Sequence, residues 1–167
     1  GALSRGTGGE AGDHAGAWCV STKYSRLQVW GAGGVRRVAA LPASDEYYTV
    51  DAGPEGSAAF VADYSGNKIR RVEVATGAVT TVAGSGSRGS ADGVGGAALF
   101  SYPCGVAISP DGSALFVVDH LNHKIRRVEV ATGAVTTFTG SGTSGSADGV
   151  GGAAQFYGPY GVAVSPD

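Results

Sequence analysis

Methionine is absent from this chain of 167 residues, cysteine occurs twice, and only 16% of the residues are charged. No stretch approaches the roughly 18 consecutive apolar residues of a membrane-spanning helix, and no charged start followed by an apolar core marks a signal peptide. Lys and Arg number 12 against 14 Asp and Glu, so no overall positive field attracts nucleic acid. A start at Gly1 without methionine indicates a piece of a longer or processed polypeptide, and the sequence leaves its cellular compartment open.

Glycine, in contrast, occurs 30 times, beside 43% apolar residues. This composition is too apolar for a disordered tail and rich in residues that favour turns, as expected for many short strands. The composition therefore predicts an all-β protein.

The chain is built from copied units. Residues 60–111 and 116–167 align without a gap, and 38 of the 52 aligned positions are identical. The stretch KIRRVEVATGAVTT recurs unchanged after 56 residues, and weaker copies extend upstream. Such a period is typical of repeat architectures. Cys19 and Cys104 are not equivalent in the repeat, so we expect two unpaired, partly buried thiols.

Each unit contains four short apolar runs separated by turn residues. In the last complete unit, SPDG after the first run is typical of a type I turn, and ATG before the fourth run supplies a glycine for a left-handed position. Four strands joined in this way form an antiparallel meander. The second run, ALFVV, does not alternate apolar with polar residues, so both of its faces need cover. Sheets stacked radially, as in a β-propeller, provide that cover.

The segment VVDHLNHKIRRV resembles the NHL repeat, in which an Asp ends the second strand and is followed by Asn, His, a basic residue and Ile. All five positions match in the last complete unit, at Asp119, Asn122, His123, Lys124 and Ile125. In the preceding unit Asp63, Lys68 and Ile69 match, whereas Gly66 and Asn67 occupy the Asn and His positions. The first unit keeps only Arg26 and Leu27. The resemblance implies a propeller of the six-bladed kind.

Counting the strands gives about three blades, so we predict a partial, open propeller arc of four-stranded antiparallel meanders. The expected organisation is a Gly-rich segment at 1–15 and a propeller fragment at 16–167. Within the fragment we expect a degenerate blade 1 at about 16–41, blade 2 at about 47–84, blade 3 at about 102–140, and the first strand of a further blade at about 158–167. Flanking blades of the same polypeptide, or a neighbouring subunit, are expected to cover the open ends.

The loops on one face of the blades are the candidate binding site. If the first strand of a blade descends, the loop between its second and third strands (the b–c loop) and the connection from its fourth strand to the next blade (the d–a connection) share the upper face. These loops carry most differences between the two copies, as expected of a recognition surface. The candidate residues are Tyr64, Asn67, Tyr102, His120, Leu121, His123, Tyr157 and Tyr160. Tyrosine suits an interface because its ring buries area while its hydroxyl stays wet, although these rings could equally cover a central channel.

Asp63, Asp119 and Asn122 have a structural explanation, because short polar side chains at strand ends bind turn amides. We predict no metal site, since the positions of His120 and His123 hold Tyr64 and Asn67 in the other copy. We predict no cofactor either. The glycine-rich segments 89–98 and 145–154 lack the ending of a phosphate-binding loop and offer one carboxylate each, too few for calcium.

Basic residues recur at matching points on successive blades. They could form a stripe for an acidic partner or single-stranded RNA, or instead form ion pairs with Glu73 and Glu129, which the negative net charge favours. The residues concerned are Lys68, Arg70, Arg71, Lys124, Arg126 and Arg127.

The sequence therefore predicts a non-catalytic protein-interaction or scaffold module that binds an unidentified protein through the loop face, as part of a larger NHL propeller protein. No catalytic constellation recurs in the repeats. One alternative is a metal-dependent lyase or hydrolase of the six-bladed propeller type, which rests on fold analogy. The second alternative is single-stranded RNA binding by the basic stripe.

Overall fold

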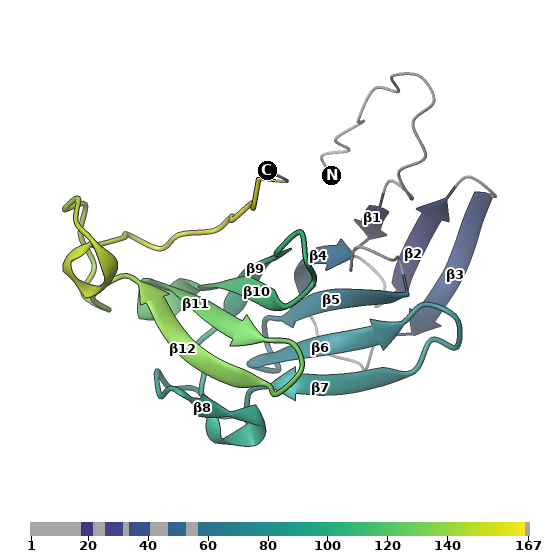
Figure 1. The fold of residues 1–167 in the computed structure, drawn as a ribbon, viewed down its shortest axis with the longest axis horizontal. Helices are drawn as coiled ribbons and strands as arrows, with labels where there is room; N and C mark the ends of the chain where they lie inside the picture. The colour runs from purple at the N-terminus through teal and green to yellow at the C-terminus, as the bar shows by residue number, and fades with distance from the viewer. Residues whose placement is uncertain (1–17, 22–25, 32–33, 41–46, 53–56, 166–167) are drawn as a thin grey trace.

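The structure, a computed structural model, describes residues 18–21, 26–31, 34–40, 47–52 and 57–165. These residues form three antiparallel sheets arranged one after another as an open arc (Figure 1). The only helices among them are single 3₁₀ turns, and none has the length and hydropathy to cross a bilayer. The predicted all-β, partial propeller is confirmed.

Blade 1 is a three-stranded sheet in the order β1-β2-β3, and blade 2 is a four-stranded sheet in the order β4-β5-β6-β7. Neighbours along the chain pair with one another, as a meander requires. The strands of blade 1 are β1 Trp18–Ser21, β2 Arg26–Gly31 and β3 Gly34–Ala40. Those of blade 2 are β4 Tyr47–Ala52, β5 Ala58–Asp63, β6 Lys68–Glu73 and β7 Val79–Ala83.

Blade 3 has five strands, in the order β8-β12-β11-β10-β9. The meander itself comprises β9 Pro103–Ile108, β10 Ala114–Asp119, β11 Lys124–Glu129 and β12 Ala134–Thr139. The fifth strand, β8 Gly93–Val94, precedes the meander in the chain and lies in the connection from blade 2. It pairs antiparallel with the start of β12, so the connection from blade 2 forms the outer edge of the blade 3 sheet. The sequence did not predict this strand.

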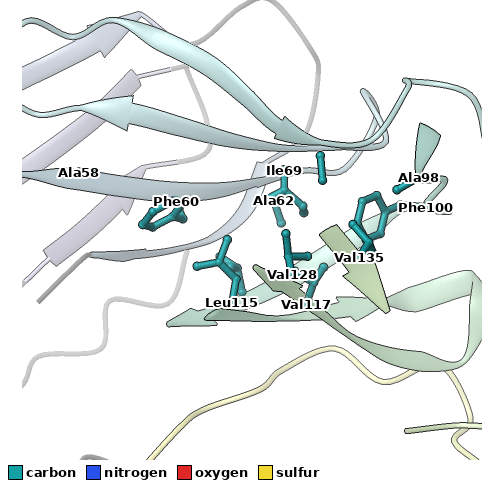
Figure 2. Close-up of a cluster of buried hydrophobic side chains, with 12 residues drawn as sticks. Ala58, Phe60, Ala62, Ile69, Ala98, Phe100, Leu115, Val117, Val128 and Val135 are labelled. Atoms are coloured by element: carbon teal, nitrogen blue, oxygen red, sulfur yellow. The ribbon is translucent and has the colours of Figure 1, made fainter. Parts of the chain in front are cut away.

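The main core lies between blades 2 and 3. Alternate residues of β5 face blade 3, and alternate residues of β10 face back, so that Phe60 and Leu115 lie in one buried cluster (Figure 2). Phe100, from the connection between the blades, is completely buried in the same cluster. The uniform burial of β5 explains why its sequence does not alternate, because both of its faces are covered.

The far side of blade 3 holds a smaller cluster, in which Cys104, Val118 and Ile125 are buried. Phe156 and Val162, from the chain that follows blade 3, pack against this cluster and remain partly exposed. The second connection thus begins to cover the far side of blade 3, as Phe100 covers the side shared with blade 2.

The strand predicted at 158–167 is not present over 158–165, the part of it that the structure describes. A first strand of a blade is held by its hydrogen bonds to the second strand, and no described strand pairs with this segment. The segment lies against β9 instead, where the Cys104 thiol donates to the carbonyl oxygen of Tyr160 at 3.4 Å.

Candidate functional site: the loop face

The loop face consists of the b–c loops, 64–67 and 120–123, together with the connections that follow blades 2 and 3. We call residues 84–102 the first connection and residues 140–158 the second connection, and we count Tyr160, which lies just after the second connection, with the loop face. Each b–c loop ends in a residue with a left-handed backbone, Asn67 at φ 51° and His123 at φ 52°. Asparagine and histidine tolerate this conformation better than β-branched residues do, which explains why these two types can alternate at the repeat position.

Asn67 and His123 perform the same task with different chemistry. The Asn67 side-chain oxygen accepts a hydrogen bond from the N–H of Tyr102 at 3.0 Å. At the equivalent place, His123 Nδ1 accepts from the N–H of Gly158 at 3.1 Å. Each side chain thereby fixes the end of a connection on its own blade. The sequence predicted that both residues belong to a binding surface. In the structure their side chains accept hydrogen bonds from backbone N–H groups.

The predicted aromatic side chains come together in pairs across the loops. The ring centroids of Tyr64 and Tyr102 lie 4.6 Å apart, and the Arg88 guanidinium lies 4.1 Å from the Tyr102 centroid. In the next blade His120 and Tyr160 lie 4.5 Å apart. His123 and Tyr157 form a further, more distant stacked pair at 6.4 Å. The b–c loop and the connection of each blade thus present a joint aromatic surface.

Three of the predicted binding residues are strongly exposed: Tyr157 by 84%, Tyr160 by 59% and Leu121 by 49%. Tyr64, Tyr102 and His120 are half-buried, and Asn67 is buried. His120 Nδ1 lies 3.0 Å from the carbonyl oxygen of Pro159, which only an N–H at that nitrogen can satisfy. The exposed rings therefore project from loops whose other residues are held in place by burial and hydrogen bonds.

A buried ion pair lies within blade 3 beneath these loops. Arg126 and Asp119 have no exposed side-chain surface, and Arg126 Nη1 lies 2.8 Å from Asp119 Oδ2. Oδ1 accepts from the N–H of Ser101 at 2.8 Å, and Oδ2 accepts from the Asn122 amide at 2.8 Å. Every group that contacts this carboxyl is a donor, which matches the ionised form.

Arg126 also binds the first connection directly. Its Nη1 donates to the carbonyl oxygen of Leu99 at 3.2 Å, and its Nη2 donates to that of Ala91 at 3.1 Å and to Asp92 Oδ1 at 2.6 Å. Asn122 donates to the carbonyl oxygen of Gly89 at 2.7 Å. Polar side chains of blade 3 therefore hold the connection that arrives from blade 2.

The two carboxyls around Arg126 differ in environment. Burial raises the pKa of Asp119, while the bonds from Asn122, Ser101 and Arg126 oppose that rise. Partial desolvation of Asp92 also disfavours its charge, yet Arg126 and Thr137 together hold the pKa of Asp92 below its ordinary value. Burial likewise raises the pKa of the Cys104 thiol to about 11, with the Asp119 charge as a second cause.

The sequence treated Asp63, Asp119 and Asn122 as turn-binding residues. The structure places them at their strand ends: Asp63 Oδ1 accepts from the N–H of Gly66 at 2.9 Å, and Asp119 accepts from Asn122. The sequence did not predict the buried role of Arg126. KIRRVE is identical in the two copies, and both of its arginines were predicted to lie at the surface. Register separates Arg126 from Arg127, because Arg126 pairs with Val117, a fully buried residue of β10. Register alone does not predict the ion pair, since Arg70 pairs with the equally buried Val61 and is half-buried.

Two of the remaining basic residues, Arg71 and Arg127, form the predicted ion pairs, whereas Arg70 donates to the Thr81 hydroxyl at 3.2 Å. Arg71 and Glu73 lie 2.9 Å apart, and Arg127 pairs with Glu129. Lys124 donates to Ser90 of the first connection at 2.8 Å. Within the described part of the chain, no group of three His, Cys, Asp or Glu residues is placed to hold a metal ion.

The repeats have relatives among known proteins. Over 124 residues, 70% of this chain, it is 32% identical to the Arabidopsis thaliana protein SUPPRESSOR OF QUENCHING 1, chloroplastic, and covers 12% of it. It is 37% identical over 94 residues, 52% of this chain, to human NHL repeat-containing protein 2, and covers 13% of it. The chain thus spans about an eighth of these relatives. No family model matches the chain.

Solved structures share the arrangement of the blades. An auxiliary nutrient binding protein from Bacteroides thetaiotaomicron matches with a TM-score of 0.68 at 25% identity, over 86% of this chain and 38% of that protein. Virginiamycin B lyase from Staphylococcus aureus matches with a TM-score of 0.54 at 22% identity, over 72% of this chain and 36% of the lyase. At 22% identity, the similarity to the lyase shows a shared fold and nothing more.

Successive four-stranded meanders, packed face to face and tied by their connections, define a β-propeller module. The Asp-Asn-His-basic-Ile motif of blade 3 and the similarity to NHL repeat-containing protein 2 support NHL-type repeats. The chain is similar to NHL-repeat β-propellers over about half of its length.

Proposed function

We propose that this chain is a non-catalytic protein-interaction module that binds an acidic segment of a partner through the loop face, as part of a larger propeller protein. The observation that carries the proposal is the combination of exposed rings and cations on that face. Tyr157 and Tyr160 are exposed there, and the exposed Arg88 stacks on Tyr102.

The charges of the loop face support an acidic partner. The carboxyls that end the second strands, Asp63 and Asp119, are buried, and Asp92 of the first connection pairs with Arg126. The second connection carries one exposed carboxyl, Asp148. Lys68 and Lys124 follow the b–c loops and are half-buried. A surface of tyrosines with a few cations is typical of protein interfaces, where Tyr and Arg are enriched.

The site is also arranged for recognition by rigid groups. The backbone on either side of Tyr157 is fixed, because the N–H of Gly158 is bound by His123 and Phe156 packs on the blade. Binding to a preformed loop loses less conformational entropy than binding to a flexible one. These features support a binding site more than a catalytic one, since no described acid, base and nucleophile lie together on the face.

The test is a selection of peptides on the purified chain. A random 12-residue phage library is enriched on the wild-type chain, and synthetic fluorescein-labelled copies of the winners are titrated by anisotropy. We expect the winners to be rich in Asp and Glu. The triple variant Leu121→Ala, Tyr157→Ala, Tyr160→Ala should bind them at least about tenfold more weakly, as expected for loss of about 1.4 kcal/mol.

Phe138→Ala provides a matched control, because Phe138 is an exposed aromatic residue on β12, outside the loops. Peptides that bind the triple variant as tightly as the wild type would contradict the proposal. A labelled U12 oligoribonucleotide tests the competing nucleic-acid reading under low salt, where phosphate contacts are strongest. Binding of U12 that acidic peptides displace would assign the face to RNA instead.

A further inference from the structure

The two connections contain one identical segment, GSADGVGGAA, at 89–98 and at 145–154. In each copy an aspartate is followed directly by a glycine, as Asp92–Gly93 in the first connection and Asp148–Gly149 in the second. Because the neighbouring residues are the same, a difference in reactivity between the two aspartates of the folded chain comes from their surroundings.

Asp92 is held by blade 3. Its Oδ1 accepts from Arg126 Nη2 at 2.6 Å and from the Thr137 hydroxyl at 3.2 Å, and its Oδ2 accepts from the N–H of Thr137 at 3.3 Å. The backbone beside it is also fixed, because Gly93 belongs to β8, which pairs with β12. The Asp92 carboxyl can therefore turn toward the Gly93 nitrogen only by breaking a charged hydrogen bond.

Asp148 lies in the same local fold without these restraints. The N–H of Gln155 donates to the carbonyl oxygen of Ala147 at 2.9 Å, as the equivalent residues do in the first connection. Asp148 and Gly149 are both exposed, and Gly149 lies in no strand. Within the part of the chain that the structure describes, no hydrogen bond or ion pair reaches the Asp148 carboxyl. This carboxyl is free to turn toward the next backbone nitrogen.

We propose that Asp148 is a site of spontaneous isomerisation to isoaspartate, and that blade 3 protects Asp92 from the same reaction. The backbone nitrogen of Gly149 attacks Asp148 Cγ, and this nitrogen is accessible because glycine has no side chain. The N–Cγ bond forms, the Cγ–OH bond breaks, and the amide proton leaves with the hydroxyl as one water molecule.

Water then opens the resulting five-membered imide. Addition at Cγ restores aspartate, whereas addition at the main-chain carbonyl carbon of Asp148 leaves the chain linked to Gly149 through Cγ. One water is released and one is consumed, so the mass of the chain is unchanged. The proposal does not depend on the binding function of the loop face.

A further Asp-Gly pair lies in the turn between β9 and β10, at Asp111–Gly112. The Ser109 hydroxyl and the N–H and hydroxyl of Ser113 donate to the Asp111 carboxylate and lower the pKa of Asp111 to about 2. The step that releases water starts from the protonated carboxyl, so these bonds oppose it. We therefore expect Asp111 to isomerise more slowly than Asp148.

The modification should alter the second connection. Isoaspartate adds one methylene to the main chain directly after Ala147, whose carbonyl oxygen accepts from the N–H of Gln155. An aged sample should therefore contain a population in which the Gln155 amide exchanges faster with deuterium, in proportion to its isoaspartate content.

The test is warm incubation of the full chain at mildly acidic pH, once folded and once unfolded in guanidinium chloride. Cleavage after Lys and Arg places Asp92 on peptide 89–124 and Asp148 on peptide 128–167, and electron-transfer fragmentation identifies isoaspartate in each. In the folded chain we expect Asp148 to isomerise at least about tenfold faster than Asp92, because reaction at Asp92 must first break a charged hydrogen bond. In the unfolded chain the two rates should be equal, since the flanking residues are identical.

Two variants separate the sites. Asp148→Glu should abolish the modification there, because the longer side chain does not form the five-membered ring, and should leave Asp92 unchanged. Thr137→Val removes a hydroxyl that binds Asp92 and should raise isomerisation at Asp92 but not at Asp148. Thr136→Val, at the exposed neighbouring residue of β12, is the matched control.

Equal rates at Asp92 and Asp148 in a chain that circular dichroism shows to be folded would overturn the proposal. A preference for Asp148 that persists in guanidinium chloride would do so as well, because it could not come from the fold. Absence of isoaspartate at Asp148 in the folded chain, with its formation in the unfolded chain, would show that the second connection restrains its own aspartate.

Discussion

At the scale of single residues, the two arginines of one strand show how position decides chemistry. Arg126 and Arg127 are neighbours in β11, yet one is completely buried in an ionic cluster and the other forms a half-exposed pair with Glu129. A buried ion pair stabilises little by its presence, because desolvation offsets most of the attraction. Its loss is costly, since the remaining charge stays buried.

We expect Arg126→Met to lower the free energy of unfolding by about 3–5 kcal/mol, because it leaves Asp119 buried without its cation and frees the first connection. Arg127→Met is the matched control and should change stability by less than about 1 kcal/mol. Urea denaturation followed by circular dichroism measures both. Equal losses for the two variants would contradict the role given to Arg126.

The turn between β9 and β10 supplies a test of pH dependence. Asp111 accepts hydrogen bonds from the Ser109 hydroxyl at 2.5 Å and from Ser113, which lower its pKa from 3.8 to about 2. A carboxyl with a lowered pKa in the folded state binds its proton more readily when unfolded, so its stabilising effect exists above pH 3.8 and disappears toward pH 2.

The variant Asp111→Asn does not titrate in this window. We therefore expect it to lose less stability than the wild type between pH 4 and pH 2, measured as urea midpoints at each pH. Above pH 5 the wild type should be the more stable of the two. An identical fall in both proteins across the acid range would show that Asp111 does not contribute.

At the scale of elements, the meander strands followed from the sequence and the fifth strand did not. Turn residues such as the SPDG of 109–112 set strand ends locally, so β10 begins at Ala114 and ends at Asp119, as the apolar run suggested. β8 consists of two residues, Gly93 and Val94, whose pairing with β12 is a contact between distant segments. Composition and period carry no information about such a pairing.

The same limit applies to the candidate site. The aromatic residues of the loops could be named because they vary between copies, and the structure brings Tyr64 to Tyr102 and His120 to Tyr160. That Asn67 and His123 both bind backbone amides could not be foreseen, because it depends on the left-handed turn that each residue adopts. Comparison of the two copies identified the loop positions, whereas the hydrogen bonds of these residues depend on the backbone conformation of each loop.

The turn between β11 and β12 offers a prediction for one element. Gly133 has φ 70°, and a Cβ added there would lie 2.5 Å from the carbonyl oxygen of Val82. We expect Gly133→Ala to cost at least about 1–2 kcal/mol, since the left-handed conformation alone costs that much for a residue with a side chain. The result should appear as a lower urea midpoint and faster amide exchange at Gly95, whose N–H binds the Gly133 carbonyl.

Gly96→Ala is the control for this substitution, because nothing lies within 4 Å of a Cβ there and the residue has no left-handed backbone. Its stability should equal or slightly exceed that of the wild type, as alanine restricts the unfolded chain. A neutral Gly133→Ala would mean that the turn relaxes without disturbing the connection.

At the scale of the whole molecule, blades 2 and 3 are joined by a shared hydrophobic core. The main hydrophobic cluster contains residues of β5, β6, β10 and β11, so blades 2 and 3 share one core. In repeat proteins each unit contacts only its neighbours, and stability is approximately a sum of unit and interface terms. Loss of this interface should therefore affect both blades together.

We expect Leu115→Ala to lower stability by about 2–5 kcal/mol, because it opens a cavity in the shared core. Hydrogen exchange should accelerate in β5 of blade 2 as well as in β10, although the substitution lies in blade 3. Leu121→Ala, at a leucine that is 49% exposed, should change stability by no more than about 0.5 kcal/mol. Faster exchange confined to blade 3 would indicate that the blades unfold independently.

The connection that crosses from one blade to the edge of the next has a consequence for how such chains lengthen. Because the period of 56 residues includes both a meander and the segment that reaches its successor, a tandem duplication copies the joint together with the part it joins. A newly inserted unit would arrive with its own fastening to whatever follows and with the arginine that its predecessor requires. Growth by whole units then needs no compensating change elsewhere in the chain.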